Sequence, residues 1–172
     1  PPRYLPAAAG LLLQTEVEIM GKALESPTRP LATVLGGAKV SDKIKLLENL
    51  LTRVDALFIG GGMAATFLKA QGKPVGASLM EEGIIGYAAD LMARARDKNV
   101  TLYLPKDVII ASEFSRDPSQ TGSVDVDHVP DNFHIMDIGP ATVEDFAAHL
   151  SPCKTVIWNG PMGVFEYDKF GK

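Results

Sequence analysis

The residues best suited to chemistry in this sequence are glycines that follow apolar runs. Three runs end in glycine-rich turns, which read GGAK at 36–39, GGG at 60–62 and NGPMG at 159–163. In an open parallel sheet, ligands bind beyond the carboxyl ends of the strands, where glycines let the backbone approach a ligand closely. One such turn is a weak signal, because a glycine pair after a strand is often only a tight turn. Three of them indicate a ligand-binding crevice.

The first turn also carries positive charge. Lys39 lies in the turn, and Lys43 follows four residues later in a helix that we expect to begin near Ser41. Both ammonium groups would then share one space with the free N–H groups of that helix, an arrangement that attracts phosphate. The alternative is a pair of solvated lysines, with Ser41 or Asp42 only capping the helix. Spacing alone leaves both interpretations open, and neither GxxxxGK[ST] nor a GxGxxG that opens a helix is present.

The other two turns contribute backbone and a few side chains. GGG at 60–62 would let a flat ring lie against the backbone, or would serve only helix–sheet packing below Ala64 and Ala65. The last turn brings Val164, Phe165 and Glu166 near the same crevice. The apolar pair suits a base or ribose, and the carboxylate can accept hydrogen bonds from ribose hydroxyls. Taken alone, these residue types are more typical of a core phenylalanine and a solvated glutamate.

The remaining candidates for chemistry are weaker. His128, His134 and His149 show no metal-ligand spacing, so we predict no metal site and interpret them as structural or surface residues. Cys153 is the single cysteine, which excludes an internal disulfide. The formal net charge of -4 disfavours a duplex nucleic acid as partner. No apolar run approaches the roughly 20 residues of a membrane span.

Apolar runs and amphipathic segments alternate along the chain, which is long enough for one domain with a sizeable core. Continuous apolar runs suit parallel strands covered on both faces, and we expect them at 31–35, 55–59, 100–104, 107–111 and 155–158. Helices are expected at 7–24, from about 41 to 54, at 84–95 and at 143–150. This order predicts an α/β fold with three layers and a doubly wound, mostly parallel, Rossmann-like sheet. The polar segment 112–132 reads as a loop or a small β excursion at the sheet's edge.

Three motifs in this order resemble the phosphoglycerate kinases: LGGAKVSDKI, FIGGGMAATFL and TVIWNGPMGVFE. The resemblance runs from about Leu5 to Lys172, and LPAAAGLLLQTEVEIMGKAL is similar to the family's interdomain segment. It implies an interdomain segment and leading helix over 1–25 and a nucleotide-binding domain over 26–172 that is incomplete at its C-terminal end. Phe133–Met136, which the resemblance places at the far wall of the adenine pocket, departs from the tryptophan and glycine of animal members and is closer to the bacterial type.

The resemblance implies Mg-ADP or Mg-ATP as ligand, with phosphoryl transfer between 1,3-bisphosphoglycerate and ADP in glycolysis. Lys39 matches the lysine that contacts the nucleotide phosphates and the phosphoryl group in transfer, and Lys43 matches a second phosphate-binding lysine. These two are the implied catalytic residues. The remaining implied contacts are Gly37 and Ala38 near the phosphates, Gly61, Gly62 and Leu79 along the adenine, and Asn159, Pro161, Val164 and Glu166 along the ribose and outer edge.

The resemblance also implies parts that this sequence does not contain. The family's glycine-rich motif with the magnesium-binding aspartate would follow Lys172, and the N-terminal domain that binds 3-phosphoglycerate would precede this one. We therefore expect the chain to be inactive by itself. The family further implies a monomeric, cytoplasmic full enzyme with no nucleic-acid or membrane partner.

Three other interpretations remain open. One is a non-catalytic nucleotide-binding or regulatory module of the same fold. A second is a Rossmann-type oxidoreductase domain, which would need a GxGxxG turn and an acidic residue after the second strand. A third is a purely structural α/β domain, in which Lys39 and Lys43 would not affect nucleotide affinity.

Overall fold

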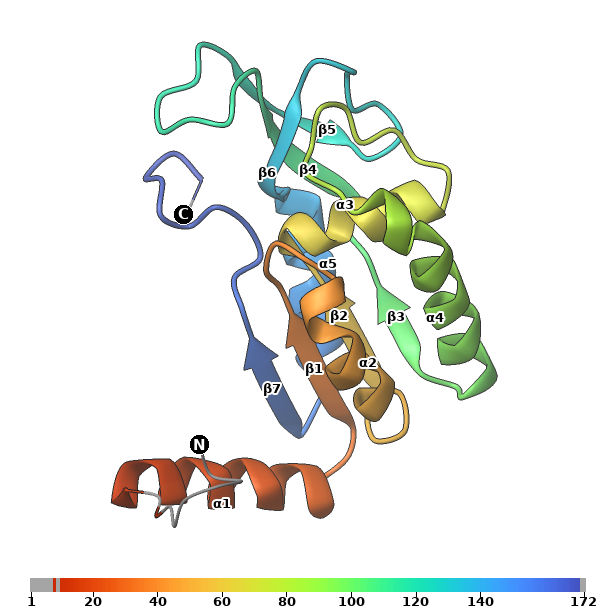
Figure 1. Ribbon diagram of the computed structural model, residues 1–172, viewed down its shortest axis with the longest axis vertical. Helices are drawn as coiled ribbons and strands as arrows, with labels where there is room; N and C mark the ends of the chain where they lie inside the picture. The colour runs from red at the N-terminus through yellow and green to blue at the C-terminus, as the bar shows by residue number, and fades with distance from the viewer. Residues whose placement is uncertain (1–7, 9, 171–172) are drawn as a thin grey trace.

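The computed structural model describes residues 8 and 10–170, in which a parallel sheet and a smaller antiparallel sheet are covered by helices (Figure 1). The parallel sheet has the strand order β3-β2-β1-β7. Its strands are Leu31–Leu35 (β1), Ala56–Ile59 (β2), Thr101–Tyr103 (β3) and Thr155–Asn159 (β7). The four strands predicted in these places are confirmed to within one residue at each end.

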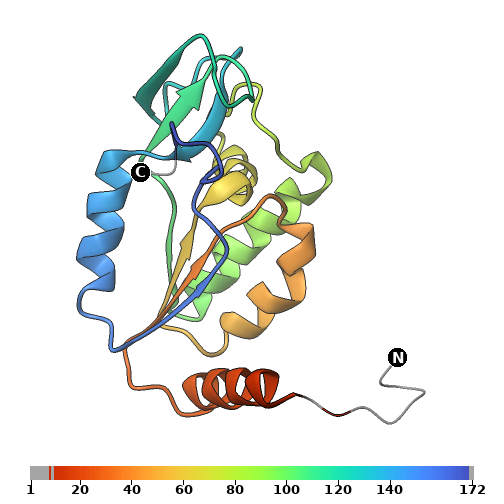
Figure 2. The ribbon, with the colours of Figure 1, turned by 90° about the vertical axis from the view of Figure 1, so that its left-hand side faces the viewer.

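Helices cover both faces of this sheet, as predicted for a doubly wound fold. The helices on one face are α2 (Ile44–Leu50), α3 (Gly61–Ala70) and α4 (Ile85–Asp97), and α5 (Pro140–Leu150) lies on the other (Figure 2). Side chains alternate along β1, so Leu31 and Leu35 pack toward the first group while Val34 packs with Phe58 and Phe146 under α5. All five residues of β1 are buried, which explains its uninterrupted apolar sequence.

The opening helix α1 spans Leu11–Glu25, close to the predicted 7–24. Ala7 lies outside the described residues. Figure 2 shows α1 beyond the end of the sheet at which β1 begins, apart from the helices that cover the two faces. Leu11, Leu12 and Val17 are exposed on it. The predicted domain boundary between residues 25 and 26 stays a prediction, and it coincides with the end of α1.

The prediction that 107–111 belongs to the parallel set is wrong. This segment forms β4 (Asp107–Ala111), which pairs antiparallel with β5 (Thr121–Asp125) and β6 (His134–Ile138) in a separate sheet of order β5-β4-β6. Only residues 104–106 separate β3 from β4, whereas a parallel crossover needs about a dozen residues or more. The expected β excursion within 112–132 is therefore β5, at the edge of this second sheet and not of the parallel one.

The second sheet packs on α3. Ala65 and Leu68 of α3 share a buried cluster with Val108 and Ile110 of β4. Strand β6 was not predicted, because HIMDI has neither a continuous apolar run nor a regular alternation. Its placement matters for the site, since β6 lies next to α3 at the end of the parallel sheet where β1 and β2 finish (Figure 1).

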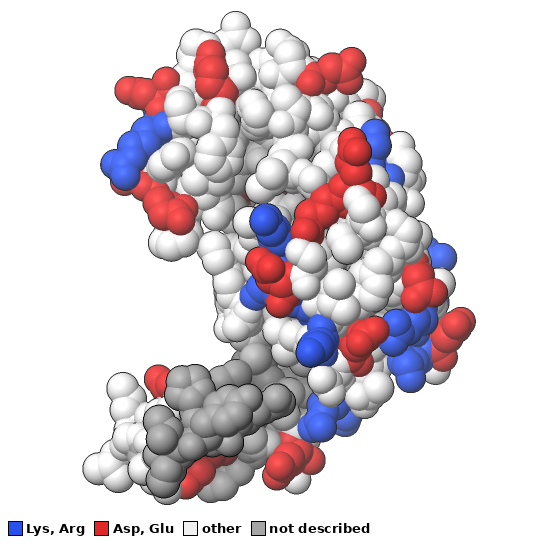
Figure 3. Space-filling view, viewed as in Figure 1, with Lys and Arg blue, Asp and Glu red and all other residues white. Residues whose placement is uncertain are grey.

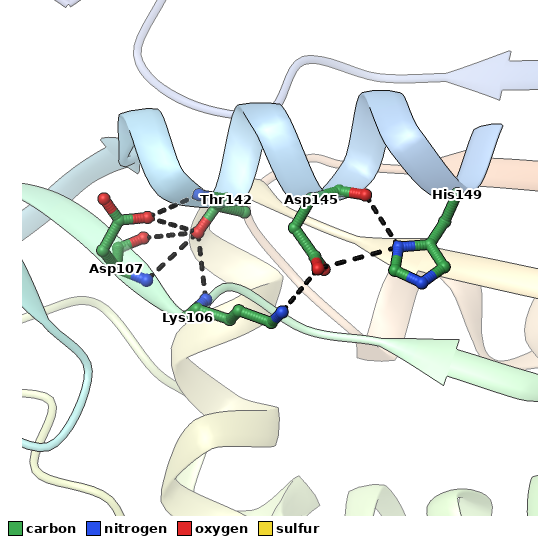
Figure 4. A network of polar contacts seen from close by, with 5 residues as sticks. All are labelled: Lys106, Asp107, Thr142, Asp145 and His149. Atoms are coloured by element: carbon green, nitrogen blue, oxygen red, sulfur yellow. Dashed lines mark hydrogen bonds and ion pairs between the residues drawn. The ribbon is translucent and has the colours of Figure 1, made fainter. Parts of the chain in front are cut away.

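A buried polar joint connects the second sheet to α5 (Figure 4). Gly139 precedes α5 and has no side chain to cap it. The carboxylate of Asp107 on β4 instead accepts the N–H groups of Ala141 and Thr142, at 3.1 and 2.7 Å. The buried Thr142 hydroxyl in turn accepts the backbone N–H groups of Lys106 and Asp107, at 2.9 and 3.1 Å. Asp107 thus supplies the N-terminal cap of a helix distant in sequence.

We expect Asp107→Ala to lower the free energy of unfolding by about 2 kcal/mol or more, because it removes the cap of α5 and leaves the N–H of the buried Thr142 without its acceptor. Urea unfolding curves measure this. Lys106→Ala is the matched control, since it removes the neighbouring exposed ion pair with Asp145 and keeps the backbone contacts. Lys106→Ala should lower the free energy of unfolding by no more than about 1 kcal/mol. Equal losses for the two variants would contradict the assignment of Asp107 as the cap.

Candidate functional site

The three glycine-rich turns meet at one end of the parallel sheet. Because β1 lies between β2 and β7, the turns that follow these three strands are neighbours. Backbone hydrogen bonds join them: Gly36 N donates to Asn159 O at 3.0 Å, and Gly61 N donates to Met162 O at 2.6 Å. Met63 N donates to Gly37 O at 2.9 Å. The turns therefore form one connected floor.

The glycines are required by the packing of this floor. A Cβ added to Gly36 would lie 1.8 Å from the carbonyl oxygen of Pro161. Gly61 has a φ of +64°, and a Cβ there would lie 2.8 Å from the backbone nitrogen of Gly37. Both observations leave room only for glycine. Close packing of GGG at 60–62 is thus observed, and its close neighbours belong to the first and last turns.

A hollow of about 370 Å³ lies on this floor, within the usual range of ligand pockets. Predicted site residues from all three turns and from the segment before α4 line it: Gly37, Ala38, Gly61, Gly62, Leu79, Pro161, Val164 and Glu166. Residues before 40 and after 160 therefore share one pocket wall. The convergence that the glycine pattern predicted is observed, although the ligand contacts themselves stay predictions.

Sequence reasoning missed much of the pocket's other wall. The additional lining residues are Ala65, Ser78, Phe114, His134, Ile135, Met136, Gly163 and Tyr167. Phe114 forms edge-on aromatic contacts with His134 and Tyr167, at centroid distances of 6.4 and 6.2 Å. Spacing alone predicts a structural or surface role for His134, whereas the resemblance places residues 133–136 at the far wall of the adenine pocket, and the structure finds His134 in this wall. Recognising β6 as a strand is the step that would have brought His134 into the site.

The two lysines lie at the edge of the floor and not in the lining. Lys43 Nζ donates to the side-chain oxygen of Asn159, which joins the first turn to the last one. Lys43 is also close to Gly37, where an added Cβ would be 3.5 Å from Lys43 Cε. Lys39 is exposed and follows Ala38, which lines the pocket. On the face in Figure 3, acidic and basic side chains are intermixed and form no extended positive patch.

The expectation that free helix N–H groups accompany the lysines is wrong. A short 3-10 helix, Ser41–Lys43, precedes α2, and its N-terminal groups already have an acceptor. Glu81 Oε2 accepts the N–H groups of Val40 and Ser41, at 2.6 and 3.0 Å. Burial opposes the ionisation of Glu81, but hydrogen bonds from Ser41 and Val40 and the charge of Lys39 outweigh it and lower its pKa. No motif in the sequence indicates this contact, which joins residues that lie 40 and 41 positions apart along the chain.

The last turn is fixed to the second sheet and to its own strand. Val164 N donates to Met136 O at 2.9 Å. The side chain of Asp137 fills the space beside Gly163, and burial raises its pKa. At the other end of the turn, the indole N–H of Trp158 donates to Gly160 O at 2.7 Å, although 62% of this residue is exposed. These contacts hold the pocket-lining residues 161–166 in place.

Neither a metal site nor a membrane span is found among residues 8 and 10–170. This part of the chain contains no group of three or more His, Cys, Asp or Glu side chains that could hold a metal ion. None of its helices is both long and apolar enough to cross a membrane.

Comparisons with known proteins agree with the geometry. The profile of the family "Phosphoglycerate kinase" matches residues 1–172. The chain is 54% identical over 168 residues to the phosphoglycerate kinase of Moorella thermoacetica and 48% identical over 170 residues to that of Finegoldia magna. These matches cover 97% and 99% of this chain, but only 42% and 43% of the two relatives.

Solved structures give the same result. Phosphoglycerate kinase from Coxiella burnetii matches with a TM-score of 0.90 and 48% identity over 95% of this chain and 42% of that one. The enzyme from Pyrococcus horikoshii matches with a TM-score of 0.78 and 28% identity over 94% and 41%. The chain therefore spans less than half the length of the proteins it matches. From the shared motifs, the matched fold and the full coverage by the family profile, we conclude that this chain belongs to the phosphoglycerate kinase family.

Proposed function

We propose that this chain is the nucleotide-binding part of a phosphoglycerate kinase, which transfers a phosphoryl group between 1,3-bisphosphoglycerate and ADP to give 3-phosphoglycerate and ATP. The observation that carries the proposal is the convergence of three glycine turns on one pocket, with Lys43 joining the first turn to the last at the edge of its floor. Phosphoryl transfer depends mainly on positioning and on neutralising charge, because the protein need supply little covalent chemistry. This site offers both.

The pocket suggests an orientation for the nucleotide. Its apolar part, between Gly61, Leu79 and Ile135, suits the flat face of adenine. Glu166 at the outer edge accepts hydrogen bonds from ribose hydroxyls. The phosphates then extend past Gly37 toward Lys39 and Lys43, which neutralise the negative charge on the transferred group.

Magnesium and the second substrate are assigned to no residue here. A magnesium ion bound with the nucleotide would neutralise phosphate charge, but the described residues contain no group of three metal-ligating side chains, so we derive no step through it. The phosphoglycerate substrate would bind through the part of the family that has no counterpart in this chain. We further propose that the full enzyme is a cytoplasmic monomer.

Titration calorimetry with ADP, and with NAD as the competing ligand, tests the proposal. We expect ADP to bind and NAD to bind more weakly, because no GxGxxG turn is present to hold a dinucleotide pyrophosphate. Preference for NAD would favour an oxidoreductase domain, and binding of neither ligand would favour a structural domain.

A turnover assay separates the kinase from a non-catalytic module. We expect the purified chain to make no ATP from 1,3-bisphosphoglycerate and ADP, because charge neutralisation by two lysines is only part of the required site. Joining the chain to the remaining parts of a related enzyme should produce turnover that Lys39→Ala abolishes. Turnover by the chain alone would refute the first expectation, and an inactive but folded chimera that binds ADP would favour a regulatory module.

A further inference from the structure

Glu81 holds the turn that carries both lysines, and we propose that it positions Lys39 and Lys43 for the nucleotide phosphates. The inference rests on the function proposed above and adds a positioning residue outside the pocket lining. No motif in the sequence pointed to this carboxylate, which lies about 40 residues beyond the lysines it would control.

The contacts of Glu81 fall between the two lysines. Its Oε2 accepts the N–H groups of Val40 and Ser41, and its Oε1 accepts the Ser41 hydroxyl. Val40 is fully buried, so water cannot replace Glu81 as the acceptor of its N–H. Lys39 immediately precedes these residues and Lys43 follows them closely. One carboxylate thus fixes the backbone from which both ammonium groups project.

Glu81 is itself held in place. Its backbone N–H donates to the Thr66 hydroxyl at 3.2 Å, and Thr66 is buried in α3. Its carbonyl accepts the N–H of Ile84 at 2.9 Å, in the short helix that leads into α4. Ser78 and Leu79, only a few residues earlier, line the pocket. The segment 78–81 therefore joins the wall proposed for the base to the turn proposed for the phosphates.

The chemistry of the contact favours an anion. Three donors converge on one side chain, and an ionised carboxylate is the side chain that offers only acceptors. These contacts and the charge of Lys39 lower the pKa of Glu81 despite the opposing effect of burial. A group whose pKa is lowered by folding stabilises the fold above its ordinary value of 4.5 and loses that contribution as the pH falls through the lowered pKa. The contact is therefore intact near neutral pH.

The test compares the affinities of ADP and adenosine in calorimetry for the unaltered chain, Glu81→Gln, Glu81→Ala and Glu82→Gln. We expect both Glu81 variants to bind ADP at least about tenfold more weakly while adenosine affinity stays within about twofold, because only the phosphate end loses its positioned charges. Glu82→Gln removes the same charge at the exposed neighbouring position and should change neither affinity. In a Lys39→Ala background, Glu81→Gln should have a much smaller effect on ADP.

Each result bears on a separate claim. If the unaltered chain does not bind ADP, the proposed function fails and this inference with it. If the unaltered chain binds ADP and Glu81→Gln binds it equally well, only the inference is overturned. Parallel loss of ADP and adenosine affinity, or thermal melts showing that neither Glu81 variant folds, would make Glu81 a purely structural residue and would also overturn it.

Discussion

Gly36→Ala should abolish ADP binding and lower the free energy of unfolding by about 3 kcal/mol or more, at the upper end of what overpacking costs. The added Cβ would lie 1.8 Å from the carbonyl oxygen of Pro161, which is too close for a small adjustment to relieve. The contact joins the turn after β1 to the last turn, so the overlap can be relieved only if these two turns separate. Separation would open the floor of the pocket and displace the lining residues of both turns.

Gly86→Ala is the matched control for this variant. Gly86 lies in α4, and an added Cβ there has no neighbour within 4 Å. Alanine should stabilise the helix by about 0.5–1 kcal/mol and leave ADP affinity unchanged. Urea unfolding and ADP titration measure both effects. A Gly36→Ala protein with unaltered stability and affinity would show that the turns are not packed as described.

Lys39→Ala and Lys43→Ala should each weaken ADP binding by about 10- to 100-fold, since a hydrogen bond to a charged group contributes about 1.5–3 kcal/mol. Lys43→Ala also removes the contact with Asn159, so it should affect adenosine binding slightly more than Lys39→Ala does. Added salt should weaken ADP binding to the unaltered chain more than to the double variant, because the lost interactions are between charges.

Lys45→Ala controls for the general loss of a positive charge. Lys45 is exposed on α2, two residues beyond Lys43. Its replacement by alanine should therefore leave ADP affinity nearly unchanged. If ADP binds equally well to the unaltered chain and to Lys39→Ala with Lys43→Ala, the lysines are solvated surface residues. That outcome would favour the purely structural interpretation of this turn.

The sequence predicted the parallel sheet and half of the pocket because their determinants are local. Each strand of that sheet is a short apolar run, and each turn carries its glycines immediately after a strand. Placing the three turns together needed only the rule that the carboxyl ends of parallel strands share one edge. Eight of the predicted residues, from Gly37 to Glu166, consequently line one hollow, while Lys39, Lys43 and Asn159 lie outside its lining.

The parts that were missed depend on contacts distant in sequence. Strand β4 has the apolar composition of a parallel strand, and only the short connection after β3 reveals its separate sheet. The wall formed by Phe114, His134 and Tyr167 comes from a loop, an unrecognised strand and the last segment. Glu81 belongs to none of the three motifs, and only the fold shows that it caps the lysine turn.

The indole of Trp158 gives this molecule a built-in optical reporter. It is the single tryptophan in the sequence, so intrinsic emission excited at its red edge has one origin. Its N–H donates a hydrogen bond to the carbonyl oxygen of Gly160, inside the turn that leads to Pro161 and Glu166. Fluorescence from unlabelled protein should therefore follow both unfolding and movements of that turn when a nucleotide enters, with no dye or added label.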